Sequence, residues 1–145
     1  MIEDHKKVIR QVFEEIWNRS EFTLIDRFYT PEYVAHVAGS PSDIEGPEQF
    51  KQFVALHGVL TSELNFSVDD QIAEGDRVAT RWTATSKAAS GLIAGASDGQ
   101  AVTVTGISIH RFAEGRIVES WDNWDALTLY QSLGSDVFER ISLGI

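Results

Sequence analysis

The spacing of apolar residues in the first part of the chain predicts three helices. Ile9, Phe13 and Trp17 recur every four residues with charged side chains between them, as on a helix that buries one face. A short helix is expected over Phe22–Phe28. Gly46-Pro47-Glu48 begins a third helix, because proline is well tolerated at the first helical position.

Farther along the chain the apolar period changes to two, which predicts strands joined by tight turns. Glu74-Gly75-Asp76 and Glu114-Gly115 are typical turn sequences, and the glycine-rich segment 88–100 is expected to be a loop. Extended segments are predicted over Tyr33–Val37, Leu64–Val68, Arg77–Ser86, Ala101–Phe112 and Arg116–Trp124, and a closing helix over Asp125–Leu133 with Gly134 after its end. Helices followed by hairpin-linked strands indicate one α+β domain over residues 1–145, with helices covering one face of an antiparallel sheet.

Composition narrows the classes of partner. The formal net charge is -10, from 12 basic and 22 acidic residues, and the basic residues form no stripe. Nucleic acid and anionic membrane surfaces are therefore not expected as partners. The chain has no cysteine, which excludes disulfides and thiolate chemistry. No signal peptide is recognisable and no stretch approaches the ~20 apolar residues of a membrane span, so a cytoplasmic location is expected.

The Glu114-Gly115 turn predicts which side chains of the last two strands share a face. A two-residue hairpin places Ile107 opposite Asp122 and Ile109 opposite Ser120. One face then carries Ile107, Ile109, Val118, Ser120, Asp122 and Trp124, and the other carries Ser108, His110, Glu119, Trp121 and Asn123. The first face is the more apolar, so we expect it to line an interior pocket with Asp122 as its acid.

A carboxyl group in such a pocket loses hydration, which disfavours its charged form. This suits a base that takes a carbon-bound proton near neutral pH and later returns it, so Asp122 is the candidate acid/base. The alternative is an acid solvated at the rim of the pocket. Asp125 directly precedes the closing helix and is expected to cap its N-terminus.

The four histidines allow several interpretations. His36 ends an extended segment, where it either lines the pocket or is an ordinary half-buried residue. His110 falls on the polar face in the predicted register, and a one-residue shift would bring it to the side of Asp122. His5 and His57 are expected to face solvent. The histidines and acids show no ligand spacing, so a metal site is not expected.

Three tryptophans could form the walls of a pocket for a flat aromatic substrate. Trp17, Trp82 and Trp124 have the large apolar surface that this needs, and core packing is the alternative role. The pocket role is best supported for Trp124, because it shares a face with Asp122 in the predicted register.

Several strings of the sequence resemble, in their order and spacing, the SnoaL-like polyketide cyclase family over roughly residues 6–134. The strings are Phe13-Glu14-Glu15-Ile16-Trp17-Asn18, Pro31-Glu32-Tyr33-Val34-Ala35-His36, Gly46-Pro47-Glu48, residues 73–83, Gly106-Ile107-Ser108-Ile109-His110-Arg111-Phe112, residues 114–119, Trp121-Asp122-Asn123-Trp124-Asp125 and Gln131-Ser132-Leu133-Gly134.

The resemblance implies a cone-shaped fold like that of nuclear transport factor 2, with a curved sheet around helices and a deep apolar pocket, usually in a homodimer. It implies an aldol ring closure of a hydrophobic polyketide without metal or cofactor, in which one aspartate is both acid and base. The family's catalytic position matches Asp122. Where the family carries a pocket histidine this chain has Ser108, with His110 two residues later.

The leading hypothesis is therefore a cofactor-free enzyme that acts on a hydrophobic, enolisable carbonyl compound. We predict Asp122, His36 and His110 as catalytic residues, and Trp17, Tyr33, Trp82, Ser108 and Trp124 as substrate-binding residues. The alternatives are a steroid-type isomerase that uses Tyr33 to bind the enolate oxygen, an epoxide hydrolase that uses Arg81 with Asp122, and a binding protein without catalysis.

Overall fold

The computed structural model describes residues 2–88, 97 and 99–133 and has an α+β fold, as predicted. Its elements are α1 (Ile2–Gln11), the π-helical turn η1 (Val12–Trp17), α2 (Thr23–Phe28), β1 (Tyr29–Val37), β2 (Ile44–Glu45), α3 (Gly46–Leu60), β3 (Thr61–Glu74), β4 (Arg77–Ala88), β5 (Ala101–Ala113), β6 (Arg116–Trp124) and α4 (Ala126–Leu133). The predicted loop 88–100 lies mostly outside the described residues, and Gly134 lies wholly outside them.

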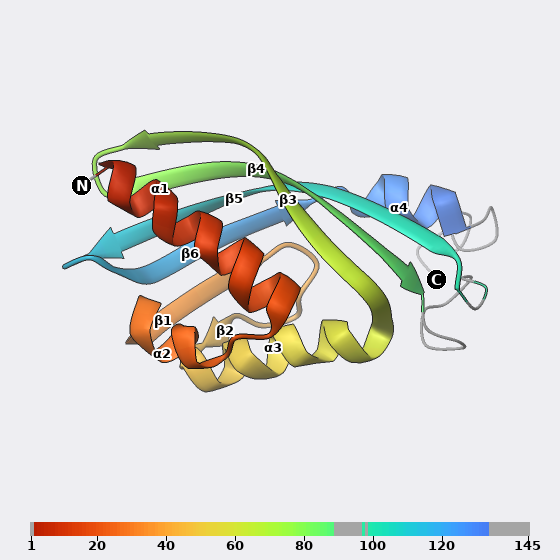
Figure 1. Ribbon diagram of the computed structural model, residues 1–145, viewed down its shortest axis with the longest axis horizontal. Coiled ribbons are helices and arrows are strands. Elements are labelled where there is room, and N and C mark those ends of the chain that lie inside the picture. Colours follow the sequence, from red (N-terminus) through yellow and green to blue (C-terminus); the bar gives the residue numbers. More distant parts are fainter. Residues whose placement is uncertain (1, 89–96, 98, 134–145) are drawn as a thin grey trace.

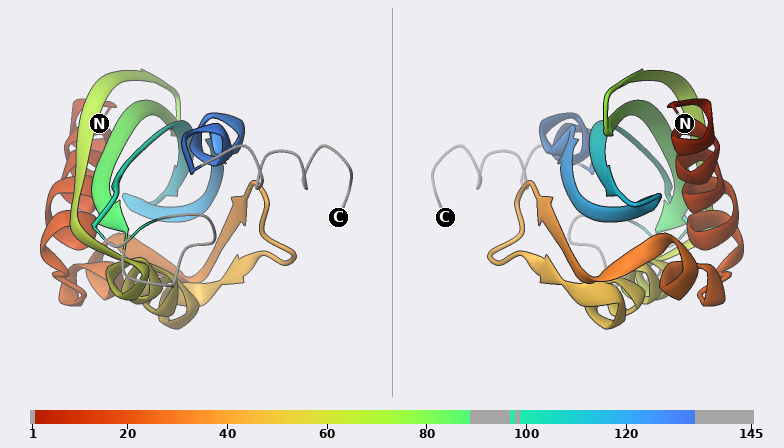
Figure 2. Two further views of the ribbon diagram at one scale, coloured as in Figure 1. Left: turned by 90° about the vertical axis from the view of Figure 1, so that its right-hand side faces the viewer. Right: turned by 90° about the vertical axis from the view of Figure 1, so that its left-hand side faces the viewer.

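Six strands form one mixed sheet in the order β2-β1-β6-β5-β4-β3 (Figure 1). Strand β1 runs parallel to β6, and the other neighbours are antiparallel. The sheet curls strongly without closing into a barrel, and α1 and α3 lie beside its concave side (Figure 2). The curvature leaves an interior space that a flat sheet of the same length would not enclose.

The first helix buries its apolar stripe against this concave side. Ile9 and Phe13 are almost completely buried and Trp17 packs partly buried against the same core, as the four-residue spacing predicted. The helix continues from α1 into the wider η1 turn, which the sequence did not predict. Asn18 then ties the helix end to β3: its side-chain nitrogen donates to the Phe66 carbonyl at 3.0 Å and its oxygen accepts from the Phe66 N–H at 2.7 Å.

Several element boundaries differ from the prediction. Strand β3 extends well beyond both ends of the predicted Leu64–Val68, and α3 continues through Gly58, a residue that commonly ends helices, as far as Leu60. The alternation in β3 is broken near Asp69, where the pairing with β4 shifts register, so the apolar pattern alone underestimates its length. Pro31 lies inside β1, at an irregularity in the pairing with β6 where a missing N–H costs little.

The hairpin of β5 and β6 begins as predicted and then changes register. Glu114 and Gly115 have φ values of 51° and 80°, which fits the two-residue turn, and Phe112 pairs with Ile117. The next pair is Arg111 with Glu119, so Val118 is an extra residue that forms a β-bulge.

Beyond the bulge every partner is shifted by one residue from the predicted register. Ser108 lies opposite Asp122 and His110 lies opposite Ser120, and Gly106 pairs with Trp124. The predicted composition of the Asp122 face is therefore wrong for Ile107, Ile109 and Val118, whose places are taken by Ser108, His110 and Ile117. Ile107 is 51% exposed, whereas Ser108 and His110 are buried.

Candidate functional site

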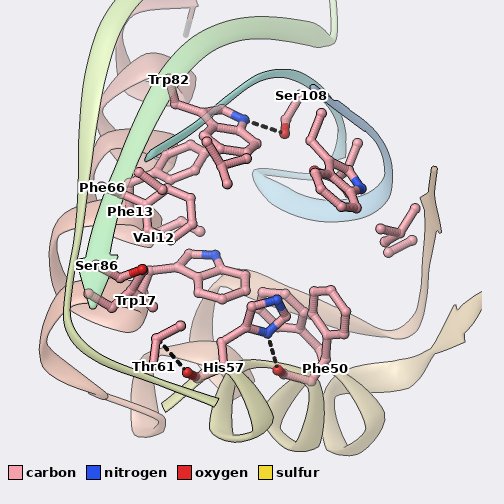
Figure 3. Close-up of a pocket in the computed structure, with 18 of the residues that line it drawn as sticks. Val12, Phe13, Trp17, Phe50, His57, Thr61, Phe66, Trp82, Ser86 and Ser108 are labelled. Atoms are coloured by element: carbon pink, nitrogen blue, oxygen red, sulfur yellow. Dashed lines mark hydrogen bonds between the residues drawn. The ribbon is translucent and has the colours of Figure 1, made fainter. Parts of the chain in front are cut away.

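A cavity of about 500 Å³ opens between the concave side of the sheet and the helices η1 and α3 (Figure 3). Most of the lining side chains are aliphatic or aromatic. All five residues predicted to bind substrate line it: Trp17, Tyr33, Trp82, Ser108 and Trp124. Asp122 and His110 line it as well, and Asp122 is the only acidic side chain among its described lining residues.

The Asp122 carboxylate is positioned by a hydrogen-bonded series that contains the hydroxyl groups of Ser120 and Tyr33. The Ser120 hydroxyl donates to Asp122 Oδ2 at 3.1 Å, and the Tyr33 hydroxyl lies 2.7 Å from the same serine oxygen. Since the single proton of Ser120 is directed to the carboxylate, Tyr33 donates to Ser120. Both Tyr33 and Ser120 are fully buried, so this series fixes the carboxylate from the side of the core.

Tyr33 remains a proton donor in this arrangement. Burial raises the pKa of its phenol, and the nearby Asp122 charge raises it further, while the hydrogen bond with Ser120 acts in the opposite direction. Tyr29, packed against Tyr33 with ring centroids 4.5 Å apart, also has a raised pKa for which burial is the main cause. Both phenols therefore stay neutral, and Tyr33 donates its proton towards the carboxylate through Ser120.

His110 reaches the Asp122 face because of the Val118 bulge. It is only 4% exposed, and neither of its ring nitrogens has a hydrogen-bond partner within the described part of the chain. Burial lowers the pKa of the imidazole, and the nearby Asp122 carboxylate partly offsets this. His110 is therefore a neutral imidazole beside a carboxylate, with hydrogen-bonding capacity that the described residues leave unused.

Two tryptophans are oriented by hydrogen bonds of their indole N–H groups. Trp82 Nε1 donates to Ser108 Oγ at 3.0 Å (Figure 3), and Trp124 Nε1 donates to the Ala38 carbonyl at 2.8 Å. The two indoles thus form fixed walls of the cavity on either side of Gly106, as expected for buried tryptophans with satisfied donors.

His36 does not line the cavity, so the prediction that places it there as a catalytic residue is wrong. Its Nε2 lies 2.8 Å from Glu119 Oε2 and its Nδ1 lies 3.1 Å from Asp43 Oδ1. Its ring stacks on Trp121, its neighbour on β6, with centroids 5.6 Å apart. Because side chains alternate along β6, Trp121 and its neighbour His36 lie on the sheet face opposite to Asp122.

The His36 cluster predicts a pH dependence of stability. The hydrogen bond that His36 donates to the Glu119 carboxylate is the main cause that raises the pKa of His36. The contribution of this contact to stability is therefore present below the unfolded pKa and is lost as pH rises through the folded pKa. The free energy of unfolding lost in His36→Gln should therefore be larger at roughly pH 6 than at roughly pH 8. Urea unfolding of both proteins at the two pH values measures this, and a pH-independent difference would contradict it.

The other two histidines, His5 and His57, were expected to face solvent, and this is wrong for both. His5 is 9% exposed because its ring stacks on Phe112 with centroids 4.0 Å apart. His57 is half-buried and lines the cavity from α3. Both residues lie near a helix end, which suggested exposure. The His5 side chain instead packs on Phe112, which is distant along the chain, and the His57 side chain turns towards the cavity.

Two predictions about charged residues have different outcomes. Asp125 caps α4 as expected: its Oδ1 accepts the backbone N–H of Thr128 at 3.0 Å. Hydrogen bonding to the Thr128 side chain, and then to its backbone N–H, lowers the pKa of Asp125. Arg81 does not approach Asp122. It is exposed and lies 3.7 Å from Asp69 in a shallow groove outside the cavity, so the residue that the epoxide hydrolase hypothesis needs is not in place. No arginine or lysine is found among the described cavity-lining residues.

The chain belongs to the SnoaL-like polyketide cyclase family, whose model matches residues 7–133. This confirms the resemblance inferred from the sequence strings. A search of curated proteins gives no significant match.

Solved structures show the same nuclear transport factor 2-like and ketosteroid isomerase-like fold. A candidate SnoaL-like polyketide cyclase from Jannaschia sp. CCS1 superposes with a TM-score of 0.80 at 20% identity, covering 92% of this chain and 93% of that one. IdmH of Streptomyces antibioticus, described as a candidate polyketide cyclase, gives 0.78 at 24% identity, with 90% and 98% covered. A Catenulispora acidiphila protein with a ketosteroid isomerase-like fold gives 0.73 at 10% identity, with 87% and 91% covered.

Two further observations concern the described residues only. Within them, no helix is long and apolar enough to cross a membrane. In the same part of the chain, no three histidine, aspartate or glutamate side chains converge as the ligands of a metal ion would.

Proposed function

We propose that this protein catalyses an intramolecular aldol ring closure of a hydrophobic, enolisable carbonyl compound, with Asp122 as the acid/base. The observation that carries the proposal is the single carboxylate at the wall of an otherwise largely apolar cavity, fixed through Ser120 and Tyr33. Membership of a cyclase family supports the same reaction class. The cavity of about 500 Å³ is within the size range of small-molecule sites.

Asp122 takes the proton from the carbon next to a carbonyl group, and the C–H electron pair becomes the enolate. Ser120 donates to Oδ2, which leaves Oδ1 free of hydrogen bonds within the described residues and available as the base. The enolate carbon then forms a C–C bond with a second carbonyl carbon of the same molecule. The resulting alkoxide takes the proton back from the Asp122 carboxylic acid, so the enzyme returns to its starting state.

His110 is the group placed to stabilise the enolate oxygen. It is neutral, lies on the Asp122 face and has no hydrogen-bond partner in the described part of the chain, so it can donate an N–H to a developing negative charge without adding a full positive one. Ser108 stands at the position of the family's histidine, and its hydroxyl oxygen accepts the indole N–H of Trp82.

The rival functions have less support. The isomerase hypothesis needs Tyr33 to donate to an enolate oxygen, but its proton is directed to Ser120. The epoxide hydrolase hypothesis lacks its arginine at the cavity. A binding protein without catalysis shares the same cavity and is distinguished by the experiment below. The homodimer and the cytoplasmic location stay predictions.

The experiment uses 2-tetralone, a flat bicyclic ketone with acidic α-protons, in D₂O. Wild-type protein is expected to accelerate deuterium incorporation at the α-carbons, followed by ¹H NMR, and the acceleration should saturate with ketone concentration. The neutral ligand N-phenyl-1-naphthylamine, followed by its own fluorescence on binding, should compete with it. Binding of this ligand together with exchange at the buffer rate would overturn the proposal in favour of the binding protein.

A further inference from the structure

His57 presents an unused hydrogen-bond acceptor to the cavity, on the wall that α3 forms. Asp122 comes from β6 of the sheet, whereas His57 comes from the last turn of α3, as Figure 3 shows for His57. The mechanism proposed above uses neither His57 nor any other group of α3. A role for His57 in binding the ligand is therefore considered.

The proton of His57 is placed by its backbone neighbour. The ring Nδ1 lies 2.8 Å from the Phe53 carbonyl oxygen, and because a carbonyl can only accept, Nδ1 carries the proton and donates. Burial lowers the pKa of His57 and keeps the ring neutral near pH 7. In a neutral imidazole protonated at Nδ1, Nε2 has a free lone pair and is an acceptor.

The surroundings of His57 fix the ring and leave that lone pair to a ligand. Trp17 and Phe53 contact the ring edge-on, with centroids 5.2 Å and 4.7 Å away. Nε2 has no partner among the described residues, and Figure 3 shows the ring directed into the cavity. The nearby Thr61 does not donate to Nε2, because its hydroxyl donates to the His57 backbone carbonyl at 2.7 Å.

We infer that His57 Nε2 accepts a hydrogen bond from a hydroxyl group on the aromatic part of the ligand, which makes it a specificity-determining residue. The ligand class is a flat, apolar molecule with a phenolic hydroxyl at the end that contacts α3 and Trp17. The inference rests on the proposed function only in taking this cavity as the substrate site, and it does not require that Asp122 be catalytic.

The test compares two probes of similar shape, 2-naphthol and 2-methoxynaphthalene, of which only the first can donate. Wild-type protein is expected to bind 2-naphthol roughly five- to tenfold more tightly, as one hydrogen bond predicts. In His57→Phe this ratio should fall to about one, because the ring shape is kept and the acceptor is lost. Isothermal titration calorimetry gives both affinities.

Three further variants make the result specific. His5→Phe, which changes a histidine outside the cavity, should keep the wild-type ratio, and so should Asp122→Asn. His57→Gln offers an amide oxygen in place of the imidazole and should keep a preference for the hydroxyl. Undiminished binding of 2-methoxynaphthalene by His57→Phe shows that its cavity is intact.

Two outcomes would overturn the inference: equal binding of the two probes by wild-type protein, or an unchanged ratio in a folded His57→Phe. A preference that disappears in Asp122→Asn instead would assign the hydroxyl to the carboxylate and overturn it as well. Because these measurements involve binding alone, their failure is distinct from a failure of the 2-tetralone exchange, which tests the chemistry.

Discussion

Replacement of Asp122 by asparagine is expected to slow α-proton exchange of 2-tetralone by roughly 10²- to 10⁴-fold, the range of a general base that is removed. An asparagine side chain has the same shape and can still accept the hydrogen bond from Ser120, but it cannot hold a proton taken from carbon. The affinity for N-phenyl-1-naphthylamine should change little, since the apolar walls are untouched. Deuterium incorporation and ligand fluorescence measure the two effects separately.

Asp125→Asn is the matched control for this substitution. It removes a carboxylate three residues away, outside the cavity lining, and asparagine caps a helix about as well as aspartate does. This variant should keep the wild-type exchange rate. Exchange within about threefold of wild type in Asp122→Asn would exclude Asp122 as the base, since the expected loss is at least two orders of magnitude.

Replacement of Gly106 by alanine is expected to lower the free energy of unfolding by about 2–4 kcal/mol, from overpacking together with a lost hydrogen bond. A Cβ atom at this position would lie 2.7 Å from the Asn123 carbonyl oxygen and 2.8 Å from Trp82 Cε2. The Asn123 backbone in the sheet cannot move away easily. The Trp82 indole must therefore move, and its hydrogen bond with Ser108 is lost. Urea unfolding monitored by tryptophan fluorescence measures the change.

Gly58→Ala is the same kind of substitution, but it is expected to raise the free energy of unfolding. Gly58 lies within α3, and an added Cβ would meet no atom within 4 Å. Alanine is the better helix former, so this variant should gain about 0.5–1 kcal/mol. If both variants lose similar stability, the close contact between Gly106 and Trp82 is not the cause, and the packing interpretation fails.

The sequence predicts most of the fold, because the fold depends on patterns that are local. The four-residue spacing of Ile9, Phe13 and Trp17 and the Glu114-Gly115 turn each specify an element without knowledge of the rest. The inward position of Asp122 was also predicted, although through a face whose other members were partly wrong. The error has one physical source, since the pattern of residues around Val118 gives no sign of a bulge.

The histidines show why the remaining part of the site could not be predicted. His57 and His36 differ in which side of the molecule they face, and this is decided by α3 packing under the sheet and by β1 pairing with β6. Parallel pairing between segments more than eighty residues apart leaves no local signal. A stronger clue was available for His57, because it lies four residues after Phe53, on the apolar stripe of α3.

The bulge at Val118 has a consequence for comparing this chain with its relatives. Ile117 and Ser120 both face inwards although they are three residues apart, so the strand contains one residue more than its length requires. A relative with a regular last strand aligns with this chain only if a one-residue gap is placed there. Counted from the turn without that gap, the position equivalent to Asp122 is assigned to Trp121, on the wrong side of the sheet.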